Sequence, residues 1–383
     1  MSQQGIKNRL NRIYNLNSTA RLKSFEGLRA WAVIMVFNVH FFGQYYKQHY
    51  FVQAGSFAEG VMKFLHSGHI GVDLFFVLSG FLIFTTLHRN KPDFRSYIGH
   101  RCSRILPAHV AVLFVILFPN IPWRSFLGNI LFFPAFFSSH NMFNPVTWTL
   151  GWEWLFYVSM FFIFRFKGDD NRRMYVGIAG ILYILLLITL EFGEASRWGE
   201  SIGNLIVPEP GRFAGFFMGV IVAHLLTIDK IFVRFQRICS FLLPIAVIGV
   251  LMSQVVWALF LGYIAKSYAF AFLNLYYLAV SACFSVIVAF LAMNSSGGSM
   301  NFLLQSTFMR IVGQISFSFY LVHFAIALPL STQIVINVDS FTSRCTHYIC
   351  AFLLTIILAS LLYYYFERPY FVSKKKQSVH VAA

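Results

Sequence analysis

Ten apolar runs, each about as long as a membrane crossing, occupy most of this 383-residue sequence and constrain its fold more than any other feature. A helix needs about 20 predominantly apolar residues to cross the hydrocarbon core of a bilayer. The runs cover residues 28–46, 70–87, 105–121, 149–164, 174–190, 213–228, 238–264, 268–293, 311–330 and 348–366. Only 11% of the residues are charged, against about 25% in a typical soluble domain. The sequence therefore predicts an all-α integral membrane protein with about ten transmembrane helices.

Lysine and arginine are unevenly distributed between the segments that join these runs. With the N-terminus in the cytoplasm, the inner segments hold 22 of the 30 lysines and arginines, the outer loops hold seven, and Arg29 lies at a boundary. Cytoplasmic loops of membrane proteins are enriched in these residues. We therefore expect both termini to be cytoplasmic, with basic tails at 1–24 and 371–383 and a ten-span domain at 25–370. The net charge of +16 is then explained by the orientation of the chain in the membrane and by contact with anionic lipids. No nucleic-acid partner is expected.

Two histidines lie deep in the predicted spans. Arg29 and His40 are eleven residues apart, which is three helical turns plus about 20°, so both side chains face the same way. At about 1.5 Å per residue, His40 lies roughly 16 Å beyond Arg29, near the middle of the bilayer. His323 lies about 20 Å beyond Arg310 in another run. Spacing alone also allows neutral histidines that bond to neighbouring helices, but ionisable groups at this depth usually have a function because burying them is costly.

Charged residues near the ends of the spans form a second set of candidates. Asp73 and Glu153 fall in the first turn of helices that start at the outer face, where a carboxylate either complements the helix dipole or contacts a hydroxyl-rich acceptor. Arg101 and Arg104 are three residues apart and are therefore neighbours on one helix face near the cytoplasmic boundary. They are either ordinary orientation residues or, together with Arg29, an anion site, since arginine binds phosphate groups bidentately.

Other patterns narrow the chemistry. No G-x-S-x-G elbow, H-E-x-x-H motif or P-loop occurs, which argues against a serine hydrolase, a zinc protease and an ATP-driven pump. The five cysteines show no CxxC pairing, and His66 and His69 have no carboxylate at metal-ligand spacing, so no metal is expected. Residues 125–137 are apolar but too short to cross and contain Pro134, which predicts an interfacial or re-entrant segment.

Seven motifs, in order, resemble those of the membrane acyltransferase-3 family, which modifies bacterial surface polysaccharides and other extracytoplasmic acceptors. They are FEGLRAWAVIMVFNVH, GVDLFFVLSGFLI, RCSRILP, WTLGWEWLFY, GRFAGFFMG, ISFSFYLVH and FERP. The likeness covers nearly the whole chain. Two positions depart from the family pattern. Glu26 stands where aspartate is commoner in the family. Many members have two consecutive glutamates in the fourth motif, whereas here Glu153 is followed by Trp154, so only Glu153 matches that acidic pair.

The resemblance implies an O-acyltransferase that moves an acyl group, expected to be acetyl, from cytoplasmic acetyl-CoA or another acyl-CoA. The acceptor would be a hydroxyl of an extracytoplasmic glycan or lipid-linked sugar, such as the O-antigen of lipopolysaccharide. The expected partners are therefore acyl-CoA, this acceptor and membrane lipids, and the expected location is the bacterial inner membrane. A different class also fits the residues alone, namely a proton-coupled transporter or flippase that uses the deep histidines as a relay.

The resemblance also implies roles for particular residues. In catalysis His40 would be a general base or a transient acyl carrier, and His323 an orienting partner or proton relay. The residues implied for binding are Arg29, Arg101 and Arg104 for acyl-CoA and Asp73, Glu153 and Arg212 for the acceptor.

Overall fold

The computed structural model describes residues 20–46, 56–137, 142–165, 180, 210–260, 269–294, 299–335 and 341–369, and all regular elements in these ranges are helical. The longer helices are α2 (Ala20–His40), α5 (Gly71–Asn90), α6 (Phe94–Leu117), α9 (Trp148–Arg165), α12 (Pro210–Leu225), α13 (Asp229–Phe260), α14 (Ala269–Met293) and α19 (Phe341–Leu362). The shorter ones are α4 (Phe57–His66), α7 (Trp123–Ile130), α8 (Pro134–Phe137), α15 (Ser299–Leu304), α16 (Thr307–Gln314), α17 (Ser316–Val322) and α18 (Leu328–Ile334). The prediction of an all-α fold is confirmed.

Seven stretches of the described chain are helical, long enough and apolar enough to cross a bilayer. They are Lys23–Gly43, Phe57–Asn90, Phe94–Leu117, Asp229–Ala258, Phe272–Met293, Ser316–Ile334 and Thr342–Glu367. The apolar helix at Gly211–Leu225 is shorter, and α9 has 18 residues. Nine of the ten predicted runs thus fall wholly or largely on described helices, and the run at 174–190 lies outside the described residues except for residue 180. The chain is an integral membrane protein.

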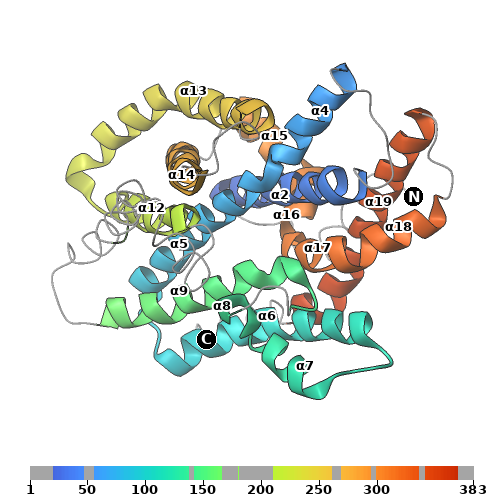
Figure 1. Ribbon diagram of the computed structural model, residues 1–383. Coiled ribbons are helices and arrows are strands. Elements are labelled where there is room, and N and C mark those ends of the chain that lie inside the picture. The colour runs from blue at the N-terminus through green and yellow to red at the C-terminus, as the bar shows by residue number, and fades with distance from the viewer. Residues whose placement is uncertain are drawn as a thin grey trace, which may run out of the picture.

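Helix α2 runs through the middle of the molecule and packs against α5, α16 and α17 (Figure 1). Its first turns are fixed by polar contacts with distant parts of the chain. Glu26 accepts hydrogen bonds from Arg310 Nε and Gln314 Nε2, both at 3.1 Å, and Ser24 Oγ donates to Asn301 Oδ1 at 2.8 Å. These bonds fix the start of α2 against α15 and α16.

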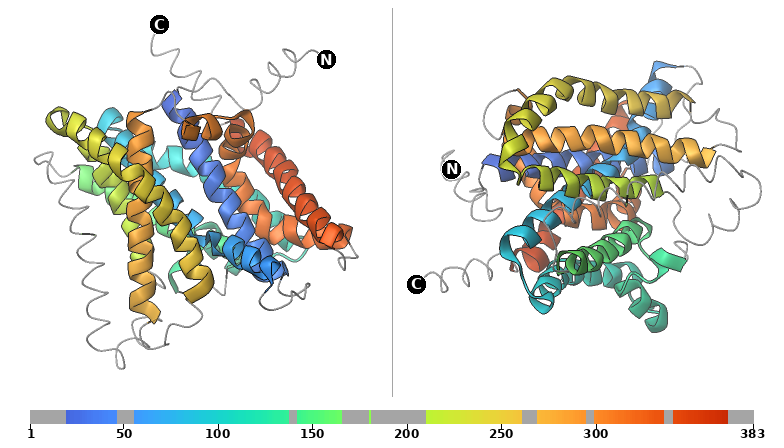
Figure 2. Two further views of the ribbon diagram at one scale, coloured as in Figure 1. Left: turned by 90° about the horizontal axis from the view of Figure 1, so that it is seen from above. Right: turned by 90° about the vertical axis from the view of Figure 1, so that its left-hand side faces the viewer.

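Glycines allow α5 and α12 to approach closely. A Cβ atom at Gly80 would lie 2.1 Å from the carbonyl oxygen of Phe216, and one at Gly219 would lie 2.1 Å from that of Val77. Small residues at such contacts are typical of helix pairs in membranes, where association depends on close packing. Helices α12, α13 and α14 lie alongside one another on this flank of the molecule (Figure 2, right).

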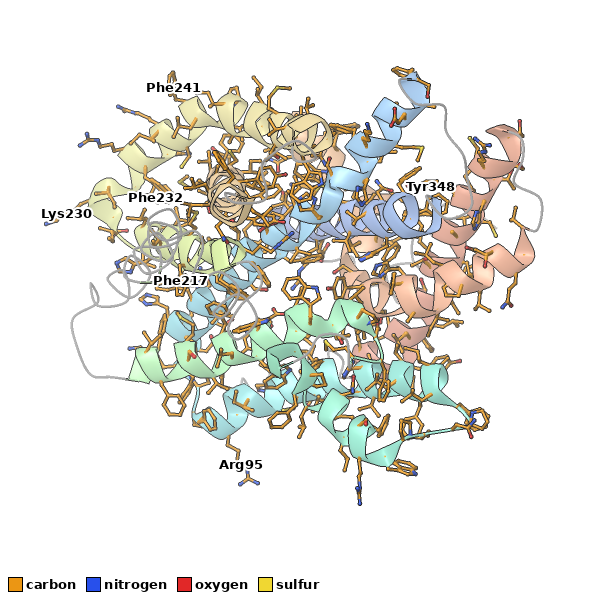
Figure 3. All side chains as sticks on the ribbon, in the orientation of Figure 1. Arg95, Phe217, Lys230, Phe232, Phe241 and Tyr348 are labelled. Atoms are coloured by element: carbon orange, nitrogen blue, oxygen red, sulfur yellow. The ribbon has the colours of Figure 1, made fainter. Side chains whose placement is uncertain are left out.

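Apolar side chains cover the outer surface of several helices. On α13 Phe241 is 75% exposed and points away from the bundle, as Figure 3 shows. Exposed apolar residues follow it at helical spacing, namely Ile245, Ile248 and Met252. Helix α19 presents a similar row, consisting of Ile349, Leu353, Ile357 and Leu361. Stripes of this kind are unfavourable in water and suit contact with lipid tails.

The apolar segment at 125–137 forms two short helices, α7 and α8, neither long enough to cross a bilayer. Pro134 begins α8, where its missing N–H costs nothing. The segment is tied to α6, because Nε2 of the buried His109 lies 3.1 Å from the carbonyl oxygen of Asn129. Trp123 and Leu127 are both 61% exposed, which gives α7 an outward apolar face.

Candidate active site

His40 and His323 come from distant parts of the chain and meet inside the bundle. His40 is the last residue of α2, and His323 follows α17 directly. Nε2 of His323 lies 2.9 Å from Nδ1 of His40, within hydrogen-bond distance. His323 is completely buried and His40 is partly buried. The two deep histidines of the sequence therefore form one pair.

Hydrogen bonds around the pair define which nitrogens carry hydrogen. Nδ1 of His323 lies 2.8 Å from the carbonyl oxygen of Tyr320. A carbonyl oxygen only accepts, so in the neutral ring this nitrogen is the donor and Nε2 of His323 is an acceptor. His40 must then donate from Nδ1. We infer that the free lone pair of the dyad lies on Nε2 of His40, the nitrogen that can act as base or nucleophile.

Both histidines stand where an α-helix changes into a π-helix. The π-helix η1 (Phe41–Tyr46) begins directly after His40, and η5 (His323–Ala327) begins at His323 itself. Single π-helical turns re-aim the side chains that follow and occur frequently at functional sites. A third, η6 (Tyr363–Glu367), ends at the buried Glu367, which accepts a hydrogen bond from Ser318 on α17. Glu367 of the FERP motif therefore supports the helix that leads to His323.

A narrow cavity of about 80 Å³ lies beside α17. Its polar lining residues are Arg29, Ser79, Arg104, Thr149, Glu153, Tyr157, Ser316 and Tyr320. Ser79 Oγ and Tyr157 Oη both donate to Glu153 Oε1, at 2.7 and 2.5 Å. The charge of Arg29 is repelled by that of Arg104 and attracted by that of Glu153. The cavity therefore combines two guanidinium groups with one carboxylate, and the carboxylate is held in place by two hydroxyl groups.

The structure divides the predicted arginine pair of α6. Arg104 lines the cavity, whereas Arg101 does not. The guanidinium carbon of Arg101 instead lies 4.5 Å from the ring centre of Tyr157 and 5.6 Å from that of Tyr97. Because Tyr157 holds Glu153, Arg101 supports the wall of the cavity from behind.

Asp73 and Arg212 form a buried ion pair with each other. Arg212 Nη1 lies 3.0 Å from Asp73 Oδ2, and the two side chains are 6% and 0% exposed. Arg212 also donates to the hydroxyl of Tyr277 at 2.5 Å and to the carbonyl oxygen of His69 at 3.3 Å. The pair joins α5, α12 and α14 in the core. Of the three residues implied for the acceptor, Glu153 lines the cavity, and Asp73 and Arg212 do not.

Replacing Asp73 by Ala should strongly destabilise the protein, because Arg212 would keep a buried charge without its carboxylate. We expect a loss of about 3–5 kcal/mol in the free energy of unfolding, measured by denaturation in detergent. Glu59→Ala is a control, since it removes the partly exposed pair with Lys63, in which the charged atoms are 3.0 Å apart, and should cost less than about 1 kcal/mol. Equal small losses in both variants would contradict this role of the buried pair.

Tyr320 connects the cavity with the histidine pair, and the sequence analysis missed it. Tyr320 lines the cavity, and its carbonyl oxygen accepts the hydrogen bond from His323. It stands three residues before His323, so helical spacing alone places it on the same face. Tyr157 stands four residues after Glu153 and could have been found by the same spacing. Ser79 comes from another helix, and no local pattern relates it to Glu153.

The fold and the site together define a multi-span membrane protein with a paired-histidine site inside the bundle. The sequence profile of acyltransferase family 3, described as an acyltransferase domain, matches residues 22–364. The chain therefore belongs to this family of membrane acyltransferases, as the seven motifs predict.

Several characterised proteins are similar to the chain. Acyltransferase MdmB of Streptomyces mycarofaciens is 24% identical over 332 residues, which cover 80% of this chain and 79% of MdmB. O-acetyltransferase OatA of Staphylococcus aureus is 24% identical over 405 residues, which cover 94% of this chain and 58% of OatA. Exopolysaccharide production protein ExoZ of Rhizobium meliloti is 35% identical over 102 residues, 24% of this chain and 32% of ExoZ. No solved structure matches the chain.

Proposed function

We propose that this acyltransferase moves an acetyl group from cytoplasmic acetyl-CoA to a hydroxyl of an extracytoplasmic glycan. The observation that carries the proposal is the hydrogen-bonded pair of His40 and His323, which Tyr320 links to a cavity lined by Arg29 and Arg104. The names of two relatives, an O-acetyltransferase and an exopolysaccharide production protein, support acetyl as the group and a polysaccharide as the acceptor. The O-antigen of lipopolysaccharide is one proposed acceptor of this class.

In the proposed reaction Nε2 of His40 accepts the proton of the acceptor hydroxyl while its oxygen attacks the thioester carbonyl carbon. The carbon–sulfur bond breaks as the new ester bond forms, and the proton passes from His40 to the departing CoA thiolate. Such general base catalysis contributes about 10²–10⁴-fold to a rate. His323 has its hydrogen fixed by Tyr320, so it keeps Nδ1 of His40 as a donor and Nε2 as the base.

Arg29 and Arg104 are the proposed contacts for the donor. Coenzyme A is too highly charged to enter lipid, so its phosphate groups stay toward the cytoplasmic ends of α2 and α6. The pantetheine arm then brings the thioester inward along the cavity. Guanidinium groups form strong, charge-assisted hydrogen bonds to phosphate. Arg101 is proposed to act on the same site indirectly, through Tyr157.

Glu153 is the proposed contact for the acceptor hydroxyl, because it lines the cavity and carries an acceptor-only side chain when ionised. Asp73 and Arg212 are proposed to act on acceptor binding only through the scaffold, as they hold α5 against α12. The whole chain is proposed to span a bacterial inner membrane ten times with both termini in the cytoplasm, in keeping with its lysine and arginine distribution.

Purified protein in detergent, incubated with labelled acetyl-CoA and no acceptor, tests the proposal. We expect saturable binding, followed by slow hydrolysis to acetate and CoA, as water replaces the missing acceptor. The analogue S-acetylpantetheine is the matched control and should bind much more weakly, because it keeps the thioester and the pantetheine arm but lacks the phosphorylated nucleotide. Absence of acetyl-CoA binding by folded protein would contradict the proposal and favour a transporter that uses the histidines as a proton relay.

A further inference from the structure

The segment between α8 and α9 makes direct hydrogen bonds to the helix that leads to His323. Asn144 is completely buried, and its Nδ2 donates to the carbonyl oxygen of Leu321 at 2.9 Å. Leu321 stands two residues before His323 and 177 positions from Asn144 in the chain. The bond therefore joins two distant segments at the backbone that precedes the catalytic pair.

Two further bonds hold the neighbouring residue, Tyr320. Its hydroxyl donates to the carbonyl oxygen of Val146 and lies 3.0 Å from Thr149 Oγ1. Because the single hydroxyl hydrogen of Tyr320 is used on Val146, Thr149 is the donor in the second bond. Residues 144–149 thus bond to both Tyr320 and Leu321, and Tyr320 carries the carbonyl oxygen that fixes the hydrogen of His323.

The segment that makes these bonds is itself fixed. Thr147 donates both its backbone N–H and its hydroxyl to the carbonyl oxygen of Asn144, at 3.0 and 2.7 Å. The backbone N–H of Phe143 donates to Asn129 Oδ1 at 2.9 Å, and the carbonyl oxygen of Asn129 lies 3.1 Å from His109 on α6. A continuous row of hydrogen bonds therefore runs from α6 through α7 to the backbone before His323.

External support matters here because the helical stretch Ser316–Ile334 changes from α-helix to the π-helix η5 at His323 itself, which interrupts its regular hydrogen bonding at the site. From these contacts we infer that Asn144 is a positioning residue, which holds the backbone at 320–321 so that His323 keeps His40 in its active tautomer. The inference rests on the proposed function and adds to it a residue outside the cavity.

The inference predicts a specific change in Asn144→Ala. Without the amide, the backbone at 320–321 loses one of its external bonds, and His323 no longer holds its hydrogen on a fixed carbonyl oxygen. Residues that orient metal-ligating histidines by hydrogen bonds contribute about 10–100-fold to affinity or activity, and we take this range for the positioning of His323. We expect the kcat of acetyl-CoA hydrolysis to fall by this order, with a changed pH dependence of kcat and an unchanged KM.

Asn301→Ala is the matched control. Asn301 is also buried and bonds to a distant segment through Ser24, but it belongs to α15 and contacts the first turns of α2, at the opposite end of that helix from His40. Its loss should lower stability without changing kcat per folded molecule or the pH profile. Tyr320→Phe is a second test variant in case Asn144→Ala does not fold. It removes only a hydroxyl group and should show the same fall in kcat.

A measurement independent of activity separates the inference from the proposed function. Diethyl pyrocarbonate modifies accessible neutral histidines, and peptide mapping gives the rate for each one. In Asn144→Ala or Tyr320→Phe, His323 should react faster relative to the buried His224 on α12, while Asn301→Ala should match the wild type. An unchanged relative rate at His323 in the folded test variants overturns the inference. Wild-type protein that does not turn over acetyl-CoA overturns the proposed function instead, and the labelling rates still decide the inference.

Discussion

Replacing His40 by Ala should lower acyl transfer by about 10²–10⁴-fold while the protein stays folded and membrane-inserted. By the hydrogen-bond argument above, His40 has the free lone pair of the histidine dyad, whereas the lone pair of His323 already accepts the hydrogen bond from His40. The measurement is the rate of label transfer from acetyl-CoA, divided by the amount of folded protein after size-exclusion chromatography in detergent.

His224→Ala is the matched control for this prediction. His224 is also a buried histidine, with 3% exposure, but it lies on α12 and not in the dyad. It should retain near wild-type transfer. If His40→Ala instead aggregates or fails to insert, His40 has a structural role. If it folds and retains full activity, the assignment of the base is wrong.

Replacing Arg104 by Ala should raise the KM for acetyl-CoA by roughly 10- to 100-fold. The estimate corresponds to loss of a charge-assisted hydrogen bond worth about 1.5–3 kcal/mol. Arg104 lines the cavity together with Arg29, so its loss removes one of the two guanidinium groups that are proposed to bind the donor. The measurement is the dependence of the initial rate on acetyl-CoA concentration, at a fixed concentration of acceptor.

Arg101→Ala provides the comparison, because it removes the same charge from the same helix three residues earlier. Arg101 stacks on Tyr157 and does not line the cavity, so its effect on the KM for acetyl-CoA should be clearly smaller. Equal effects would show that position in the cavity does not matter and that both arginines attract the donor only through their charge.

Much of the fold follows from the sequence because the bilayer leaves few options for a long apolar run. The lengths of the runs predicted helices, and helical arithmetic placed His40 and His323 at similar depth. Depth alone cannot show which helices are neighbours. The contact between the two rings depends on how α2 and α17 pack, which local spacing does not contain.

The site residues that were missed share a physical reason. Asn144 and Thr149 act through hydrogen bonds to residues more than 170 positions away, and no periodic pattern marks such a bond. The π-helical turns after His40 and at His323 also break the regular spacing on which sequence arguments depend. The pairing of Asp73 with Arg212 was invisible for the same reason, since each one separately suited a role at a span end.

The central claim is tested most directly by acetyl transfer across the membrane of proteoliposomes. These contain the purified protein in the bilayer and a soluble oligosaccharide acceptor trapped inside. Labelled acetyl-CoA is supplied only outside, and only molecules with outward-facing cytoplasmic loops can use it. We predict acetyl ester on the trapped oligosaccharide with wild-type protein and none with His40→Ala. Labelled acetyl-CoA that remains intact, beside folded and correctly inserted wild-type protein, would contradict the account.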